Sequence, residues 1–211
     1  MISAVDTVFT LLIVSDLILV GAGRLRFQIK LVAVQGLLLG LLPLTVEISP
    51  SAVIVALSAL VIKGLVFPWL MLRAIRHTQT WHEDKPLIGP LLATFAGIVN
   101  LGAAFYLCAR LNLPFSGVSR LAAPFAFFTI LSGLFMLATR QKALSMVLGY
   151  VVLENGIFAF GTAMSAHIPL IVELGVLLDL FVAVFVMGIA THQISNEFDH
   201  SDVSRLDELK G

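Results

Sequence analysis

Three ionisable side chains, Lys63, Glu154 and Asp179, lie near the middle of long apolar stretches of the sequence. Each costs about 2.5–3.5 kcal/mol at the centre of a bilayer, so such residues are usually paired and usually functional. One lysine neutralises one acid, and the second acid is left over. A left-over buried carboxyl group can take up and release a proton, as a proton relay requires. The alternative is a buried ion pair that only fixes how the helices pack.

The sequence beside Lys63 indicates a break in its helix. Pro68 follows five residues later, and its ring and missing N–H free the carbonyl group of Gly64. We therefore expect a kink there. A kink that serves packing explains the proline but not the lysine, which at such a break can act as a proton relay as well as a charge anchor.

Three further polar residues are candidates for the same pathway. Glu173 is the fourth main candidate, about one to two turns from the end of its segment, where water can reach it. Asp16 and Asn155 are secondary candidates, and for Asp16 and Glu173 a structural role is the alternative. No residue set has the spacing of a metal site or of a known catalytic motif, so we expect neither in this chain.

The composition excludes most soluble classes of protein. Of the 211 residues, 59% are hydrophobic and 12% are charged, against about 45–50% and about 25% in an ordinary soluble domain. The mean hydropathy is +1.02 and the net charge is zero, which excludes a disordered chain and a basic nucleic-acid binder. Cys108 is the single cysteine, so there is no internal disulfide. An all-α integral membrane protein remains.

Seven apolar segments of the sequence are long enough to span a bilayer, which takes about 20 residues. They run from Ser3 to Ala22, Phe27 to Val46, Ala52 to Leu72, Leu87 to Leu107, Leu121 to Thr139, Ala143 to Ala163 and Pro169 to His192. Lys63 falls in the third, Glu154 in the sixth and Asp179 in the seventh. The first lacks a basic leader and a cleavage site, so we expect a retained helix. The prediction is one polytopic helical bundle.

Shifting the chain by 116 residues against itself matches loops and intramembrane polar positions. The matched pairs are Arg24 with Arg140, Arg26 with Lys142, Gly40 with Gly156, and Lys63 with Asp179. This pattern predicts a parallel repeat of three helices, made of segments one to three and five to seven. The predicted units are residues 1–78, a linking helix at 87–110, a second unit at 117–195 and a tail at 196–211.

The basic residues predict the orientation in the membrane, because positive loops stay cytoplasmic. Ten lie on one side of the predicted spans and two on the other. The ten are Arg24, Arg26, Lys30, Arg73, Arg76, Lys85, Arg140, Lys142, Arg205 and Lys210, and the two are Arg110 and Arg120. We therefore expect the N-terminus outside and the C-terminus in the cytoplasm.

Four runs of the sequence carry a resemblance to a known family. They are SALVIKGLVFP at 58–68, GYVVLENG at 149–156, PLIVELGVLLDLFVAVFVM at 169–187 and DVSRLDELKG at 202–211. Over nearly its whole length the chain resembles component E of hydrogenase-4, a membrane subunit of formate hydrogenlyase-type nickel-iron hydrogenase complexes. The resemblance implies a non-catalytic subunit in the cell inner membrane. Its partners would be antiporter-like and other membrane subunits, with the nickel-iron centre and iron-sulfur clusters in other chains and no cofactor in this one.

The last three segments are also similar to the K subunit of respiratory complex I and the C subunit of Mrp antiporters. In that wider family two membrane glutamates form part of a lateral proton pathway. The first aligns with Val151, one turn before Glu154, and the second aligns with Asp179. Two alternatives stay open: a stand-alone or Mrp-type cation/proton antiporter subunit, and a scaffold that anchors a peripheral enzyme.

Overall fold

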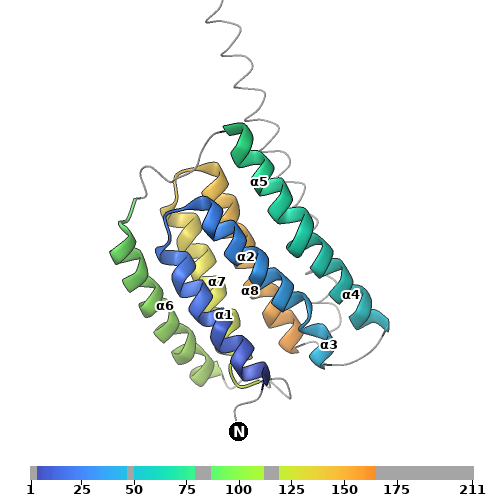
Figure 1. The fold of residues 1–211 in the computed structure, drawn as a ribbon. Helices are drawn as coiled ribbons and strands as arrows, with labels where there is room; N and C mark the ends of the chain where they lie inside the picture. The colour runs from blue at the N-terminus through green and yellow to red at the C-terminus, as the bar shows by residue number, and fades with distance from the viewer. Residues whose placement is uncertain (1–3, 47–49, 79–86, 112–118, 165–211) are drawn as a thin grey trace, which may run out of the picture.

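The computed structural model describes residues 4–46, 50–78, 87–111 and 119–164, and every element in these ranges is helical. The helices stand side by side as a bundle (Figure 1). They are α1 (Ala4–Gly21), α2 (Leu25–Gly40), α3 (Pro43–Val46), α4 (Pro50–Val61), the π-helical turn η1 (Ile62–Val66), α5 (Phe67–Thr78), α6 (Pro90–Leu111), α7 (Ala122–Thr139) and α8 (Ala143–Met164).

Five stretches of the described residues are long and apolar enough to cross a membrane. They are Leu25–Thr45, Ala56–Arg73, Pro90–Leu111, Ala122–Thr139 and Leu144–Thr162. These match the second to sixth predicted segments, and the first predicted segment forms α1. The seventh, Pro169 to His192, lies outside the described residues. The helical class is therefore confirmed, while the total of seven spans and the three-helix repeat stay predictions.

The second segment is not the unbroken helix that its apolar run predicted. α2 ends at Gly40 and the short α3 begins at Pro43. Proline has no N–H with which to continue the helical ladder. The backbone tightens into turns here, with Leu42 N–H donating to the Leu39 carbonyl at 2.9 Å and Thr45 N–H to the Leu42 carbonyl at 2.9 Å.

The helix break expected beside Lys63 takes the form of a π-helical turn. α4, η1 and α5 follow one another without a gap from Pro50 to Thr78, and Figure 1 shows them as one long rod. Phe67 N–H donates to the carbonyl of Ile62, five residues back. A π turn inserts an extra residue and changes the direction of the side chains around it, and such turns recur at functional sites. Lys63 lies inside this turn.

Helices α7 and α8 form the most extensive helix pair, and glycines bring them close together. A methyl group added at Gly156 would lie 2.7 Å from the backbone nitrogen of Ile130, and one added at Gly149 would lie 3.0 Å from that of Leu137. Small residues at both positions let the two backbones meet. The close contact at Gly149 and Gly156 therefore fixes the position of Glu154, which lies between them on α8, relative to α7.

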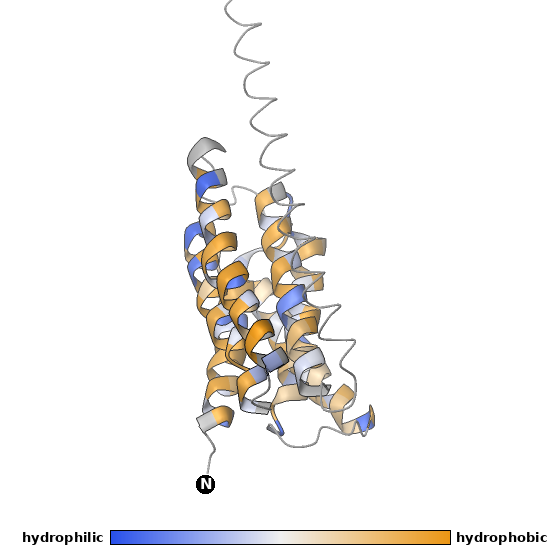
Figure 2. Ribbon diagram, turned by 90° about the vertical axis from the view of Figure 1, so that its right-hand side faces the viewer, coloured by the Kyte–Doolittle hydropathy of each residue, from blue (hydrophilic) through white to orange (hydrophobic). Residues whose placement is uncertain are grey.

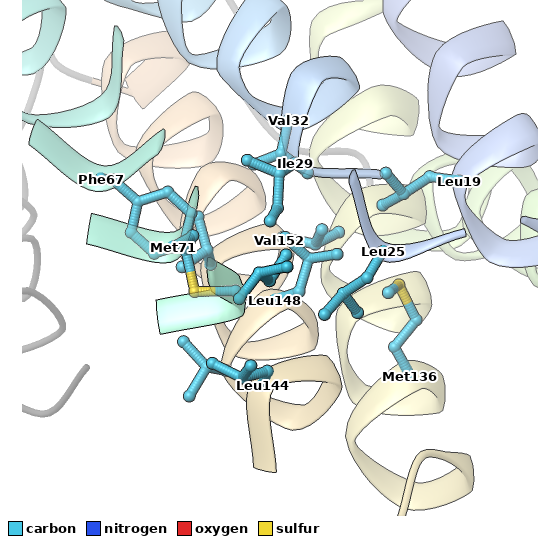
Figure 3. Packing of buried hydrophobic residues seen from close by; sticks show 13 residues of the cluster. Leu19, Leu25, Ile29, Val32, Phe67, Met71, Met136, Leu144, Leu148 and Val152 are labelled. Carbon is cyan, nitrogen blue, oxygen red and sulfur yellow. The ribbon is translucent and has the colours of Figure 1, made fainter. Parts of the chain in front are cut away.

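In the described part of the chain, the buried apolar residues form two clusters at different heights in the bundle. The first cluster includes Leu19, Val32, Phe67 and Val152, and its packing is drawn in Figure 3. The second lies nearer the N-terminal end of α1 and includes Phe9, Leu12, Leu39, Ala59, Phe125 and Phe158. Figure 2 shows that most residues along the helices are hydrophobic and that a few hydrophilic positions interrupt them. Each of the central helices therefore passes from one apolar cluster to the other, and its mid-height residues lie between the two.

Candidate functional site: a buried polar layer

A buried ion pair joins Lys63 of η1 to Glu154 of α8. Lys63 Nζ lies 2.9 Å from Glu154 Oε1, and each side chain is 4% exposed. Among the described residues Oε1 has no aligned hydrogen bond, so the contact is held by charge. Two main candidates from the sequence are thus brought together although they lie 91 positions apart in the chain.

Two more residues of α8 surround the Lys63 ammonium group. Lys63 Nζ donates a hydrogen bond of 3.1 Å to Asn155 Oδ1. It also lies 4.6 Å from the centroid of the Phe158 ring, which is within the range of a cation–π interaction. We call Lys63, Glu154, Asn155 and Phe158 the Lys63 cluster. Asn155, a secondary candidate, is therefore a direct partner of the lysine.

The Lys63 cluster is closed on the side of α2 by a glycine. A methyl group added at Gly36 would lie 2.7 Å from Lys63 Cβ and 3.3 Å from the Lys63 backbone carbonyl. Contacts under 3.0 Å between such atoms force something to move, and here the neighbour is backbone and the stiff base of a side chain. Gly36 therefore sets how closely α2 and the π turn approach.

A second buried carboxyl group, Asp16 of α1, lies among uncharged polar residues. Asp16 is fully buried. Gln35 Nε2 of α2 donates to Asp16 Oδ1 at 2.8 Å and also to Ser15 Oγ at 2.7 Å. Thr129 Oγ1 of α7 is hydrogen-bonded to Asp16 Oδ2. We call Asp16, Ser15, Gln35 and Thr129 the Asp16 cluster. No lysine, arginine or histidine of the described ranges pairs with Asp16.

Both clusters lie at the level between the two apolar clusters. Asp16 lies between Leu12 and Leu19, and Lys63 lies between Ala59 and Phe67, which belong to opposite clusters. Gln35 and Gly36 are successive residues of α2, about 100° apart around the helix, and face the Asp16 cluster and Lys63 respectively. The bundle thus carries one polar layer across its middle, with α2 between its two clusters.

Two residues of the Asp16 cluster escaped the sequence analysis because they carry no charge. Gln35 and Thr129 lie within apolar helices. A search for every hydrogen-bonding side chain at mid-helix, rather than for ionisable ones, would have found both. The remaining candidates, Glu173 and Asp179, lie outside the described residues, so their place relative to the Lys63 cluster stays a prediction.

Arg140 is docked at one end of the bundle rather than solvated in its loop. The side chain is 8% exposed, and Nη2 donates to the carbonyl groups of Val20 and Ala22, each at 3.1 Å. Gln28 Nε2 donates to the Ala22 carbonyl as well, at 2.6 Å. The last carbonyl groups of a helix have no partner within it, so these side chains complete the end of α1.

Apolar helices of spanning length, with a layer of buried charged and polar groups at mid-height, define the chain as a polytopic membrane protein. Comparison with known proteins narrows this class. The chain is 35% identical over 206 residues to the uncharacterized protein Rv0085 of Mycobacterium tuberculosis, covering 94% of this chain and 92% of that one. It is 30% identical over 155 residues to hydrogenase-4 component E of Escherichia coli K12 and of Shigella flexneri, covering 73% of this chain and 71% of theirs.

The chain belongs to the hydrogenase-4 component E family. The family resemblance drawn from the sequence is thereby confirmed, while the similarity to subunit K and to the Mrp subunit stays a prediction. No family model and no solved structure matches the chain.

Proposed function

We propose that this protein is a non-catalytic membrane subunit of a formate hydrogenlyase-type hydrogenase complex, and that its polar layer is part of a proton pathway. Its similarity to hydrogenase-4 component E supports membership of such a complex. The observation that carries the pathway is the Lys63–Glu154 pair, 2.9 Å apart and nearly inaccessible to solvent. Buried ionisable groups in a membrane bundle are costly and mark proton or ion routes by default.

The geometry of the Lys63 cluster allows a proton to move without leaving a charge unsupported. Transfer of a proton from Lys63 to Glu154, whose charged atoms lie 2.9 Å apart, would convert the ion pair into two neutral groups. A proton arriving at Glu154 from elsewhere leaves the ammonium group with Asn155 and the Phe158 ring as partners. The ammonium group therefore keeps polar partners in both states of the carboxyl group, which a relay needs.

The pathway would continue beyond the Lys63 cluster through Asp179, with Glu173 towards the outer surface. The electron-transfer chemistry would belong to partner subunits that hold the nickel-iron centre and iron-sulfur clusters. In this arrangement the chain bridges antiporter-like neighbours and itself holds no cofactor.

We propose that the subunit lies in the inner membrane with its C-terminus in the cytoplasm. Arg24, Arg73 and Lys142 belong to one end of the bundle, where α1, α5 and α7 end and α2 and α8 begin. The positive-inside rule assigns that end to the cytoplasm. The first residues of α1 and α2, moved by the 116 residues of the proposed repeat, fall two residues before the first residues of α7 and α8, which supports the repeat.

The test is proton translocation by the assembled complex in membrane vesicles, with the yield of complex measured in parallel. Glu154→Gln keeps shape and hydrogen bonding but cannot carry a proton. We expect Glu154→Gln and Asp179→Asn to leave the complex assembled but to impair translocation per assembled complex, and we expect a smaller effect in Glu173→Gln. Wild-type translocation in the first two variants would mean that the Lys63–Glu154 pair only fixes how the helices pack.

A second experiment separates a complex subunit from an antiporter. The purified chain alone in liposomes should move neither protons nor sodium ions, and it should co-purify with hydrogenase subunits identified by mass spectrometry. Ion transport by the chain alone would favour the antiporter instead.

A further inference from the structure

The hydrogen bonds around Asp16 can be counted donor by donor. Thr129 Oγ1 lies in hydrogen-bonding contact with two oxygens, Asp16 Oδ2 and the Phe125 carbonyl, the latter at 2.9 Å. A threonine hydroxyl group has one proton to donate and two lone pairs with which to accept. A carbonyl oxygen can only accept. One of the two contacts therefore needs a proton that does not come from Thr129.

The other partners of Asp16 do not supply that proton. Gln35 Nε2 has two N–H groups, and it uses them on Asp16 Oδ1 and on Ser15 Oγ. Ser15 Oγ uses its own proton on the Leu12 carbonyl, at 2.7 Å. Every donor in the Asp16 cluster is thus assigned, and the contact between Asp16 Oδ2 and Thr129 Oγ1 is the one left without a hydrogen.

The charges around Asp16 lead to the same conclusion, that a proton is missing from this contact. Asp16 has no exposed surface. Within the part of the chain that the structure describes, the helices that pack against α1 are α2, α6 and α7. α7 has no charged residue, and the one charged residue of α6 is Arg110, in its last turn. The charged residues of α2, Arg26 and Lys30, are exposed near its start, at least five residues before Gln35. An ionised Asp16 would be a fully buried negative charge without a counter-charge from these helices, which is strongly unfavourable.

We infer that Asp16 is held as a neutral carboxylic acid whose Oδ2–H donates to Thr129 Oγ1, while Thr129 donates to the Phe125 carbonyl. This makes Asp16 a second proton-binding site in the polar layer, separated from the Lys63 cluster by α2. The two sites differ in kind, because one is an ion pair and the other is a neutral acid. The role of this proton in a pathway rests on the proposed function, but its presence does not.

Infrared spectroscopy of the full-length chain in a lipid bilayer at neutral pH tests the assignment. A protonated carboxyl group has a carbonyl stretching band that a carboxylate lacks. We expect such a band in the wild type, its loss in Asp16→Asn, and its shift to lower frequency in D2O. Asp6→Asn is the matched control on the same helix, because Asp6 is partly exposed and accepts a hydrogen bond from Ser119. The band should survive in that variant and in Glu154→Gln.

Thr129→Val keeps the inference testable if Asp16→Asn fails to fold. It removes the hydroxyl acceptor with little change of shape, so the Asp16 band should move to higher frequency. No difference between wild type and Asp16→Asn in the carboxylic-acid region would overturn the inference. A band that appears only after sodium ions are removed would also overturn it, since it would make Asp16 a sodium ligand. Neither result depends on turnover, so a failure here is distinct from a failure of the hydrogenase assignment.

Discussion

Breaking the Lys63–Glu154 pair from one side should cost much more stability than removing both charges. At 2.9 Å the attraction between unit charges is about 6 kcal/mol at an effective dielectric constant of about 20. Desolvating the two ions costs several kcal/mol each, so the pair adds little net stability. Lys63→Met leaves a buried carboxylate and Glu154→Gln leaves a buried ammonium group, at about 3–5 kcal/mol each. Independent effects would sum to about 6–10 kcal/mol.

We expect the double variant to cost no more than either single variant, giving an interaction energy of at least about 3 kcal/mol in the cycle. The measurement is the free energy of unfolding of the full chain in mixed micelles. The matched control is the exposed pair of Arg110 and Tyr106, in which Arg110 Nε donates a hydrogen bond of 3.3 Å to the Tyr106 hydroxyl group. Arg110→Met and Tyr106→Phe should each change stability by about 0.5 kcal/mol or less and add. Additive single costs at Lys63 and Glu154 would refute the buried pair.

Three further predictions follow from the packing and the charges. Gly36→Ala should destabilise the chain by about 1–3 kcal/mol through overpacking against Lys63, whereas Gly102→Ala, with open space around it, should be neutral or slightly stabilising; equal unfolding free energies in the two variants would contradict this. Arg140→Ala should cost about 1–3 kcal/mol by removing the side-chain donor from the Val20 carbonyl, and a thermal unfolding midpoint unchanged from wild type would argue against it. A C-terminal alkaline phosphatase fusion should be inactive, and periplasmic activity would reverse the proposed orientation.

The helices of this fold could be predicted from sequence because each apolar run needs its own hydrogen-bonded backbone in lipid. α7, for example, begins one residue after the predicted start at Leu121 and ends at the predicted residue, Thr139. The break at Pro43 was not predicted because it lies within an apolar run. Hydropathy depends on the side chains, whereas proline breaks a helix through its backbone.

The charged residues of the site could be predicted from the sequence better than the contacts between them. Lys63 and Glu154 stand out as charges in apolar helices, but the choice of Glu154 as the lysine's partner depends on the π turn and on the approach of α2 at Gly36. The Asp16 cluster needed three helices to be placed together before Gln35 and Thr129 could be seen as partners. Contacts between distant segments of this kind leave no trace in local spacing.

The most direct test of the central claim, that Lys63 exchanges a proton, is proton translocation by the assembled complex carrying Lys63→Arg. Arginine can keep the charge opposite Glu154, but its guanidinium group does not release a proton in proteins. With the yield of complex and hydrogenase turnover measured on the same vesicles, we predict normal assembly and lost translocation. Normal assembly with normal translocation would contradict the account and make Lys63 an electrostatic anchor.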